Sequence, residues 1–113
     1  MQDVNGVPHI TPQEAREWQK SGRAVLVDVR EPVELAAVAI EGAVNVPGSC
    51  FNCEDVLAAA GDKEIVFFCK MGGRAMQAHQ YFTSSTGRQA VCMDGSITGW
   101  AAAGLPVTEE SAA

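Results

Sequence analysis

One cysteine has neighbours that favour nucleophilic chemistry. Cys69 follows the apolar run 65–68, which predicts a buried strand, and it precedes a helix expected to begin at Arg74. Free backbone N–H groups and the positive end of a helix dipole stabilise an anion at such a place. Lys70 and Arg74 add positive charge. We therefore expect Cys69 to be held as a thiolate, which is the reactive form of cysteine.

The loop after this cysteine contains two adjacent glycines, Gly72 and Gly73. Glycine lets a backbone curl until successive N–H groups point at one centre and form a nest for an anion. Met71 lies near the expected loop tip, where its side chain would shield the sulfur or contact a partner protein. Residues 69–74 thus predict a small, positively charged pocket around one cysteine.

The elements that position this loop alternate between strand and helix. Short runs rich in β-branched or aromatic residues predict buried strands, and Thr11 with Glu14 predicts a capping box at a helix start. This alternation predicts an α/β fold with a parallel sheet covered on both faces, whose ligands bind beyond the carboxyl ends of the strands. Strands are expected at residues 25–29, 43–46, 65–68 and 89–93, and helices at 12–20, 33–38, 54–60, 74–83 and 97–103.

Length and composition indicate one soluble domain. We expect it to span residues 1–113, with a core of about 8–107 and a flexible tail at 108–113. A net charge of −6 argues against binding nucleic acid or an anionic membrane. No apolar run is long enough to cross a membrane, and no signal peptide is visible. The cytoplasm is therefore the default compartment, although a periplasmic protein without its leader would look the same. The sequence does not indicate an oligomeric state.

Four segments resemble the signatures of the rhodanese-like sulfurtransferase domains, and the resemblance covers about residues 8–107. Each signature is weak alone, but the four occur in the family's order and spacing. The matching segments are residues 27–35, residues 41–47, the active-site loop pattern C-x-x-G-x-R from Cys69 to Arg74, and residues 94–100 followed by 103–107.

The resemblance implies a three-layer α/β/α fold with a five-stranded, mostly parallel sheet, and a sulfurtransferase activity. Cys69 would take the outer sulfur of thiosulfate, polysulfide or a persulfide and become a persulfide itself. That sulfur would then pass to cyanide, a thiol or a protein. Lys70 and Arg74 would hold the anionic donor, and no metal or organic cofactor is required. Asp28 and Arg30 carry the family's D-x-R element and are expected to pair with neighbouring loops and hold the site.

The sequence departs from the family pattern in several places. The histidine often found before the second signature is absent from residues 38–40. The common Gly-Gly near the last helix is Asp94-Gly95, and Ala75 stands where a hydroxyl often follows the loop arginine. We expect these changes to alter packing and to remove one hydrogen bond to the loop.

Cys50 and Cys53 form an additional Cys-x-x-Cys motif after the predicted strand 43–46, so we expect them on the same sheet edge as Cys69. Three interpretations stay open. They are ordinary cysteines, with one or both in the core; a redox or relay pair that attacks the Cys69 persulfide or forms a disulfide; or ligands of zinc shared between two chains. Cys92, within a predicted strand, is expected to be inert core.

Two other classes of function remain as alternatives. Cysteine phosphatases and arsenate reductases also hold an anion between Cys and Arg, but with five residues between them. Only four residues separate Cys69 from Arg74, so the pocket suits a sulfur atom better than a tetrahedral phosphate. The other alternative is a non-catalytic sulfur-binding or regulatory interaction module. Family members of that kind usually lose the cysteine that this sequence retains.

Overall fold

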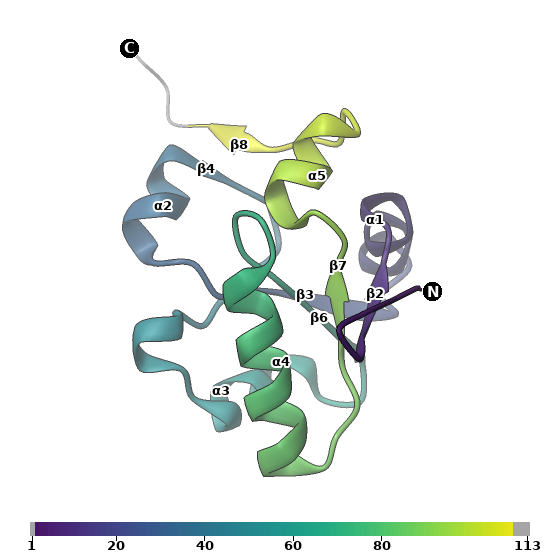
Figure 1. Cartoon of the computed structure of the whole chain (residues 1–113). Coiled ribbons are helices and arrows are strands. Elements are labelled where there is room, and N and C mark those ends of the chain that lie inside the picture. The colour runs from purple at the N-terminus through teal and green to yellow at the C-terminus, as the bar shows by residue number, and fades with distance from the viewer. Residues whose placement is uncertain (1, 110–113) are drawn as a thin grey trace.

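A central sheet separates two layers of helices (Figure 1). The computed structural model describes residues 2–109. Across the sheet, in spatial order, lie β1 (Gln2–Val4), β2 (Val7–Ile10), β7 (Val91–Met93), β6 (Glu64–Phe68), β3 (Ala24–Asp28) and β5 (Val44–Asn45). The strands from β2 to β5 run parallel, and β1 is antiparallel to β2. The α/β fold with a mostly parallel sheet is therefore confirmed.

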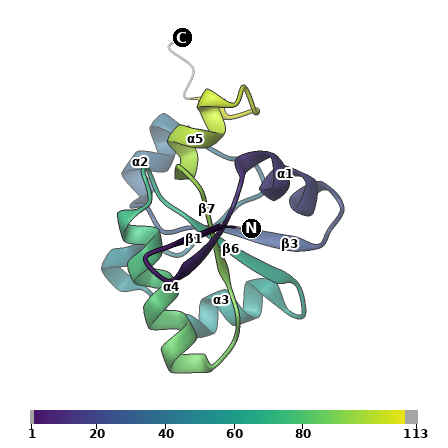
Figure 2. The same cartoon turned by 45° about the vertical axis from the view of Figure 1, so that its right-hand side comes forward.

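The helices cover the two faces in pairs, and Figure 2 shows the pairs on opposite sides of the sheet. One face packs against α1 (Pro12–Lys20) and α5 (Ser96–Ala102), with Trp100 fully buried between them and the sheet. The other face packs against α3 (Cys53–Ala60) and α4 (Gly73–Thr86). The short helices α2 (Pro32–Ala37) and η1 (Gly48–Cys50) follow β3 and β5 in the chain.

Alternation along the central strand β6 explains why the sheet needs helices on both sides. Ile65 and Phe67 belong to the core under α3 and α4, whereas Val66 and Phe68 belong to the core under α1 and α5. All four are fully buried. Successive side chains of β6 point to opposite faces of the sheet, and both faces are buried. The strand therefore needs apolar residues at every one of these four positions.

The first helix begins as the sequence predicts. The Thr11 Oγ1 accepts a hydrogen bond of 3.1 Å from the Glu14 N–H, and the Glu14 carboxylate accepts one of 3.0 Å from the Thr11 N–H. This capping box places Pro12 at the first helical position, where its missing N–H has no cost.

The amino-terminal hairpin adds one strand to the sheet that the resemblance implied. β1 and β2 are joined by Asn5-Gly6, whose positive φ angles of 53° and 81° suit a tight two-residue hairpin turn. Strand β2 then pairs with β7 in the parallel sheet. The parallel part thus has five strands, and β1 is the sixth, antiparallel strand at its edge.

The carboxyl-terminal segment contains a short strand. Thr108–Glu109 form β8, which pairs antiparallel with β4 (Val38–Ala39) in a separate two-stranded sheet. The segment expected to be a flexible tail therefore starts with a short strand, and residues 110–113 lie outside the described part. Because Val38 belongs to β4, helix α2 also ends one residue earlier than predicted. Within residues 2–109, no helix has the length and apolar character needed to cross a membrane.

Candidate active site

The loop from β6 to α4 folds back on the sulfur of Cys69. Cys69 is the first residue after β6, and it is only 2% exposed. Its Sγ accepts a hydrogen bond of 3.0 Å from the Gly72 N–H. Gly72 has a φ of 129°, which residues with a side chain rarely adopt. The glycine predicted to curl the loop therefore lies at the position where the backbone turns an N–H toward the sulfur.

The start of α5 holds the same loop through four hydrogen bonds. The Cys69 N–H donates to Ser96 Oγ at 3.1 Å, and the Ile97 N–H donates to the Cys69 carbonyl at 3.0 Å. Thr98 donates to the Lys70 carbonyl from its N–H at 3.1 Å and from its hydroxyl at 2.8 Å. Cys69 and Lys70 are thus fixed to a second element, which lies far away in the sequence.

Ser96 is a site residue that the sequence analysis missed. It is fully buried, and both Gly95 and Ser96 have positive φ angles, 73° and 52°. The pair of positions that favours glycine is therefore 95–96, and the expectation that Asp94-Gly95 occupies it is wrong. A left-handed backbone costs a non-glycine residue about 1–2 kcal/mol. The only signal in the sequence was a serine directly after the glycine of the closing signature.

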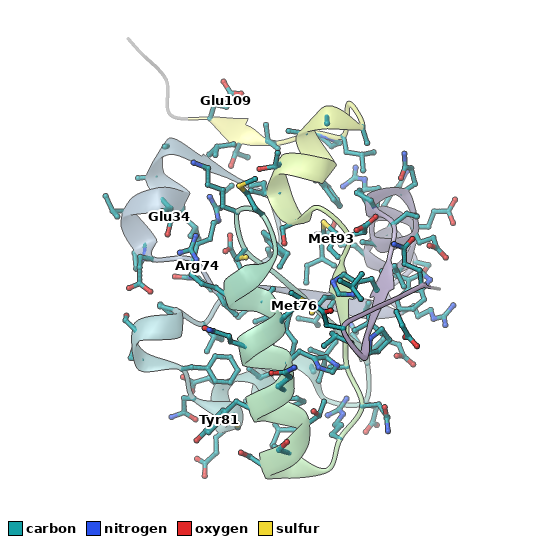
Figure 3. All side chains as sticks on the ribbon, viewed as in Figure 1. Glu34, Arg74, Met76, Tyr81, Met93 and Glu109 are labelled. Atoms are coloured by element: carbon teal, nitrogen blue, oxygen red, sulfur yellow. The ribbon has the colours of Figure 1, made fainter. Side chains whose placement is uncertain are left out.

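Arg74 is already paired with an acidic side chain of the same chain. Its guanidinium makes a two-pronged ion pair with Glu34 of α2, with N···O distances of 2.7 and 3.0 Å (Figure 3). Hydrogen bonding to Arg74 lowers the pKa of Glu34 to about 2, and the carboxylate in turn raises the pKa of Arg74. The sequence analysis missed Glu34, although it lies in the first signature. Arg74 as a donor-binding residue stays a prediction, but its positive charge already has a counter-charge within the chain, the Glu34 carboxylate.

Lys70 and Glu34, the acidic member of this ion pair, line the same cavity. Lys70 is exposed, and the cavity, of about 410 Å³, is also lined by Arg30, Ile97 and Thr98. The cavity joins α2, the active loop and α5, and its walls are mostly apolar apart from these charged and hydroxyl groups. Lys70 is thus the cation of the loop for which no acidic partner is found within residues 2–109.

A second cavity, of about 640 Å³, lies on the Arg74 side of the loop. Its lining includes Ser49 and Phe51 from the segment around η1, and Tyr81 from α4. Phe51 contacts the Tyr81 ring edge-on, with the two centroids 6.0 Å apart. The two predicted cations therefore line two separate cavities rather than one cradle. Met71, which lies between Lys70 and Arg74 in the sequence, is 73% exposed.

Asp28 and Arg30 form a buried ion pair at the end of β3. Their side chains are 1% and 2% exposed, and Arg30 donates to both carboxylate oxygens, with a shortest distance of 2.8 Å. Arg30 also donates to the Val38 carbonyl at 2.9 Å, and Asn45 donates to the carbonyls of both Asp28 and Arg30. The pair therefore ties the ends of β3 and β5 to β4. Because both side chains are buried, Asp28 and Arg30 are not a solvent-exposed surface pair.

The other three cysteines differ in exposure. Cys50 lies in η1 and is exposed, and Cys53 is half-buried at the start of α3 and packs against the core. Cys92 on β7 is buried, and this burial raises the pKa of its thiol to about 12, which agrees with inert core. Within residues 2–109, no three His, Cys, Asp or Glu side chains are grouped so as to hold a metal ion.

Fold and site together define an α/β protein in which one nearly buried cysteine, between a strand end and a helix start, accepts a hydrogen bond from a backbone N–H. The family model described as "Rhodanese-like domain" matches residues 11–103, and the chain belongs to this family. Sulfurtransferases are among its named relatives.

Two curated relatives and one solved structure illustrate the similarity. The chain is 40% identical over 94 residues to "Probable adenylyltransferase/sulfurtransferase MoeZ" of Mycobacterium tuberculosis, covering 81% of this chain and 24% of that one. It is 38% identical over 88 residues to the human thiosulfate:glutathione sulfurtransferase, covering 66% of this chain and 76% of that one. The thiosulfate sulfurtransferase structure from Pseudomonas aeruginosa superposes with a TM-score of 0.78 at 26% identity, covering 93% and 20%. The chain thus spans about a quarter of MoeZ.

Proposed function

We propose that this domain is a rhodanese-type sulfurtransferase that carries sulfane sulfur as a persulfide on Cys69. The observation that carries the proposal is the hydrogen bond of 3.0 Å from the Gly72 N–H to the Cys69 sulfur, inside a loop that leads into α4. A thiolate is both the nucleophile and the leaving group in sulfur transfer, and backbone N–H donors with a helix N-terminus stabilise it. Membership of a family with named sulfurtransferases supports the same reaction class.

The first step transfers sulfur from an anionic donor of the thiosulfate class. The Cys69 thiolate attacks the outer sulfur of thiosulfate, a new S–S bond forms, and the bond to the sulfonate sulfur breaks. Sulfite leaves with the electron pair of that bond, and Cys69 holds a persulfide. Polysulfide and small persulfides react in the same way, with a shortened polysulfide or a thiolate as the leaving group. No external oxidant or reductant is needed, so the step requires neither a metal nor an organic cofactor.

The second step returns Cys69 to its starting state. The thiolate of an acceptor, either a small thiol or a cysteine of a partner protein, attacks the outer persulfide sulfur. An S–S bond to the acceptor forms, and Cys69 leaves as the thiolate. Cyanide accepts the same sulfur in an assay and becomes thiocyanate.

The burial of Cys69 favours small donors. At 2% exposure, the residue can be reached only by the narrow, sulfur-bearing end of a donor. In this proposal, Lys70 attracts the anion from the cavity that it lines, and Arg74, already paired with Glu34, contributes less. Gly72 and Gly73 supply the curled backbone, Met71 covers the loop tip, and Asp28 with Arg30 holds the neighbouring loops in place.

Cys50 and Cys53 form a second, accessory part of the proposal. The exposed Cys50 would attack the outer sulfur of the Cys69 persulfide and take it over, and Cys69 would leave as the thiolate. Cys53 would then attack the inner sulfur of the new persulfide, forming a Cys50–Cys53 disulfide and releasing hydrosulfide. In this relay the two thiols are oxidised and the sulfane sulfur is reduced.

Peptide mass spectrometry after incubation with thiosulfate, and separately with polysulfide, tests the proposal. We expect one added sulfur atom on the Cys69 peptide and none in Cys69→Ser. A following incubation with glutathione should remove it. Unmodified Cys69 with both donors would contradict the persulfide mechanism, and uptake without release to any thiol would favour a sulfur-binding regulatory module.

A disulfide or added sulfur on the Cys50 and Cys53 peptide, lost in the Cys50→Ser, Cys53→Ser protein, is expected from the relay. Unchanged turnover with thiol acceptors in that double variant would contradict the relay hypothesis.

A further inference from the structure

Ser96 has a backbone conformation that its residue type does not explain. Within residues 2–109, two non-glycine residues have a positive φ, Asn5 at 53° and Ser96 at 52°. Asn5 lies before Gly6 in the hairpin turn, where asparagine is a preferred residue. Serine is not favoured in the left-handed region, so contacts with the surrounding structure must offset the strain.

The side chain of Ser96 makes its contacts with the cysteine. The residue is fully buried, and its Oγ accepts a hydrogen bond of 3.1 Å from the Cys69 N–H. The same hydroxyl lies 3.9 Å from Cys69 Sγ and donates a long hydrogen bond to it. A hydroxyl has one proton and two lone pairs, so accepting from the backbone leaves its proton available for the sulfur.

We propose that Ser96 is a positioning residue that fixes the Cys69 backbone and stabilises the Cys69 thiolate by donating its hydroxyl proton to the sulfur. Its importance for turnover rests on the proposed function, in which the thiolate is the attacking and the leaving form. A thiolate accepts but cannot donate, so the bonds from Ser96 and from the Gly72 N–H both strengthen when Cys69 loses its proton. Ser96 therefore acts on the reactivity of the sulfur and not only on the shape of the turn.

The other charged and titratable groups near the sulfur are independent of Ser96. The Arg74 guanidinium on α4 and the Cys92 thiol on β7 both interact electrostatically with Cys69. Lys70 is its neighbour in the chain. None of these side chains is hydrogen-bonded to Ser96 within the described residues. A substitution at Ser96 thus changes one donor to the sulfur and leaves the surrounding charges in place.

Two variants separate the hydroxyl from the backbone. Ser96→Ala and Ser96→Gly both remove the hydroxyl, but alanine keeps the strained φ and glycine relieves it. The measurement is the rate of Cys69 alkylation by iodoacetamide as a function of pH, followed on the Cys69 peptide, with thermal unfolding of each variant in parallel. We expect both variants to be labelled about three- to tenfold more slowly at neutral pH than the parent, with the profile moved to higher pH, since one hydrogen bond to a charged group is lost. Ser96→Gly should unfold at a higher temperature than Ser96→Ala.

Ser96→Gly decides the proposal if Ser96→Ala fails to fold. A parental pH profile of alkylation in Ser96→Gly would show that the hydroxyl does not act on the sulfur, and would overturn the proposal. Alkylation needs no sulfur donor, so this result is independent of the persulfide experiment. If Cys69 takes up no sulfur but the Ser96 variants still shift the alkylation profile, the proposed function fails and the role of Ser96 stands.

Discussion

Two arginine–carboxylate pairs lie at the carboxyl edge of the sheet, and they differ in how far water reaches them. Asp28 and Arg30 are 1% and 2% exposed, whereas Glu34 and Arg74 are 29% and 41% exposed. The buried pair has further hydrogen bonds to the backbones of neighbouring strands. The exposed pair joins α2 to the first turn of α4, directly after the loop that begins at Cys69. An arginine–carboxylate ion pair thus holds strands together in one place, and in the other it sets the net charge beside the Cys69 loop.

The largest difference between the pairs is expected when one carboxylate is neutralised. Asp28→Asn leaves the Arg30 guanidinium buried without a counter-charge, so we expect the free energy of unfolding to fall by about 3–5 kcal/mol. Urea denaturation checks this value. The matched control is Glu34→Gln, which changes the same chemical group at the exposed pair. A loss below about 1 kcal/mol for Asp28→Asn would mean that the buried pair is replaceable and that the contrast between the pairs is unfounded.

Glu34→Gln tests the functional side of the comparison. The exposed pair contributes about 0–1 kcal/mol to stability, so unfolding should change little. The Arg74 guanidinium loses its internal counter-charge and becomes available to an anion, so the KM for thiosulfate should fall roughly threefold, with kcat changed less. Steady-state kinetics at low ionic strength measure both constants. An unchanged or higher KM would show that Arg74 does not contact the donor, and would leave Lys70 as the cation that attracts it.

The smallest expected effect is the loss of the Glu34–Arg74 contribution to stability at acid pH. The ion pair lowers the pKa of Glu34 from its ordinary value of 4.5 to about 2, so the carboxylate is stabilised in the folded protein. This contribution is complete above about pH 4.5 and is lost as the pH falls toward 2. Because both side chains are about a third exposed, solvent screening limits it to less than about 1 kcal/mol. The difference in unfolding free energy between the parent and Glu34→Gln should shrink over this range. A constant difference would mean that the pair does not form in solution.

The positions of the main elements could be predicted because each one carries a local signal. The run 65–68 has no polar residue, and Thr11 with Glu14 marks a helix start, so both could be read without a structure. The strands β2 and β8 could not. Pro8 and His9 interrupt the apolar pattern of β2, and Thr108–Glu109 become a strand only because β4 offers them a partner.

The site divides in the same way. The position of Cys69 follows from its place between a strand and a helix, which are neighbours in the sequence. The partner of Arg74 is 40 residues away, and the hydroxyl of Ser96 is 27 residues from Cys69. From charge and spacing alone, Arg74 was expected to bind the donor. No local sequence pattern connects it with Glu34, so the ion pair could not be predicted. Contacts of this kind depend on how α2 and α5 pack around the loop, and that packing is a property of the whole fold.

The strand order also sets the sequence of events while the chain is being made. Strand β2 leaves the ribosome early, but its neighbour in the parallel sheet is β7, with His9 opposite Cys92. Until β7 has left the ribosome, β2 is hydrogen-bonded only to the short strand β1, and the edge that pairs with β7 stays open. Folding of the complete domain must therefore wait for almost the entire chain, and the N-terminal hairpin is exposed during that interval to any protein that binds unpaired strands.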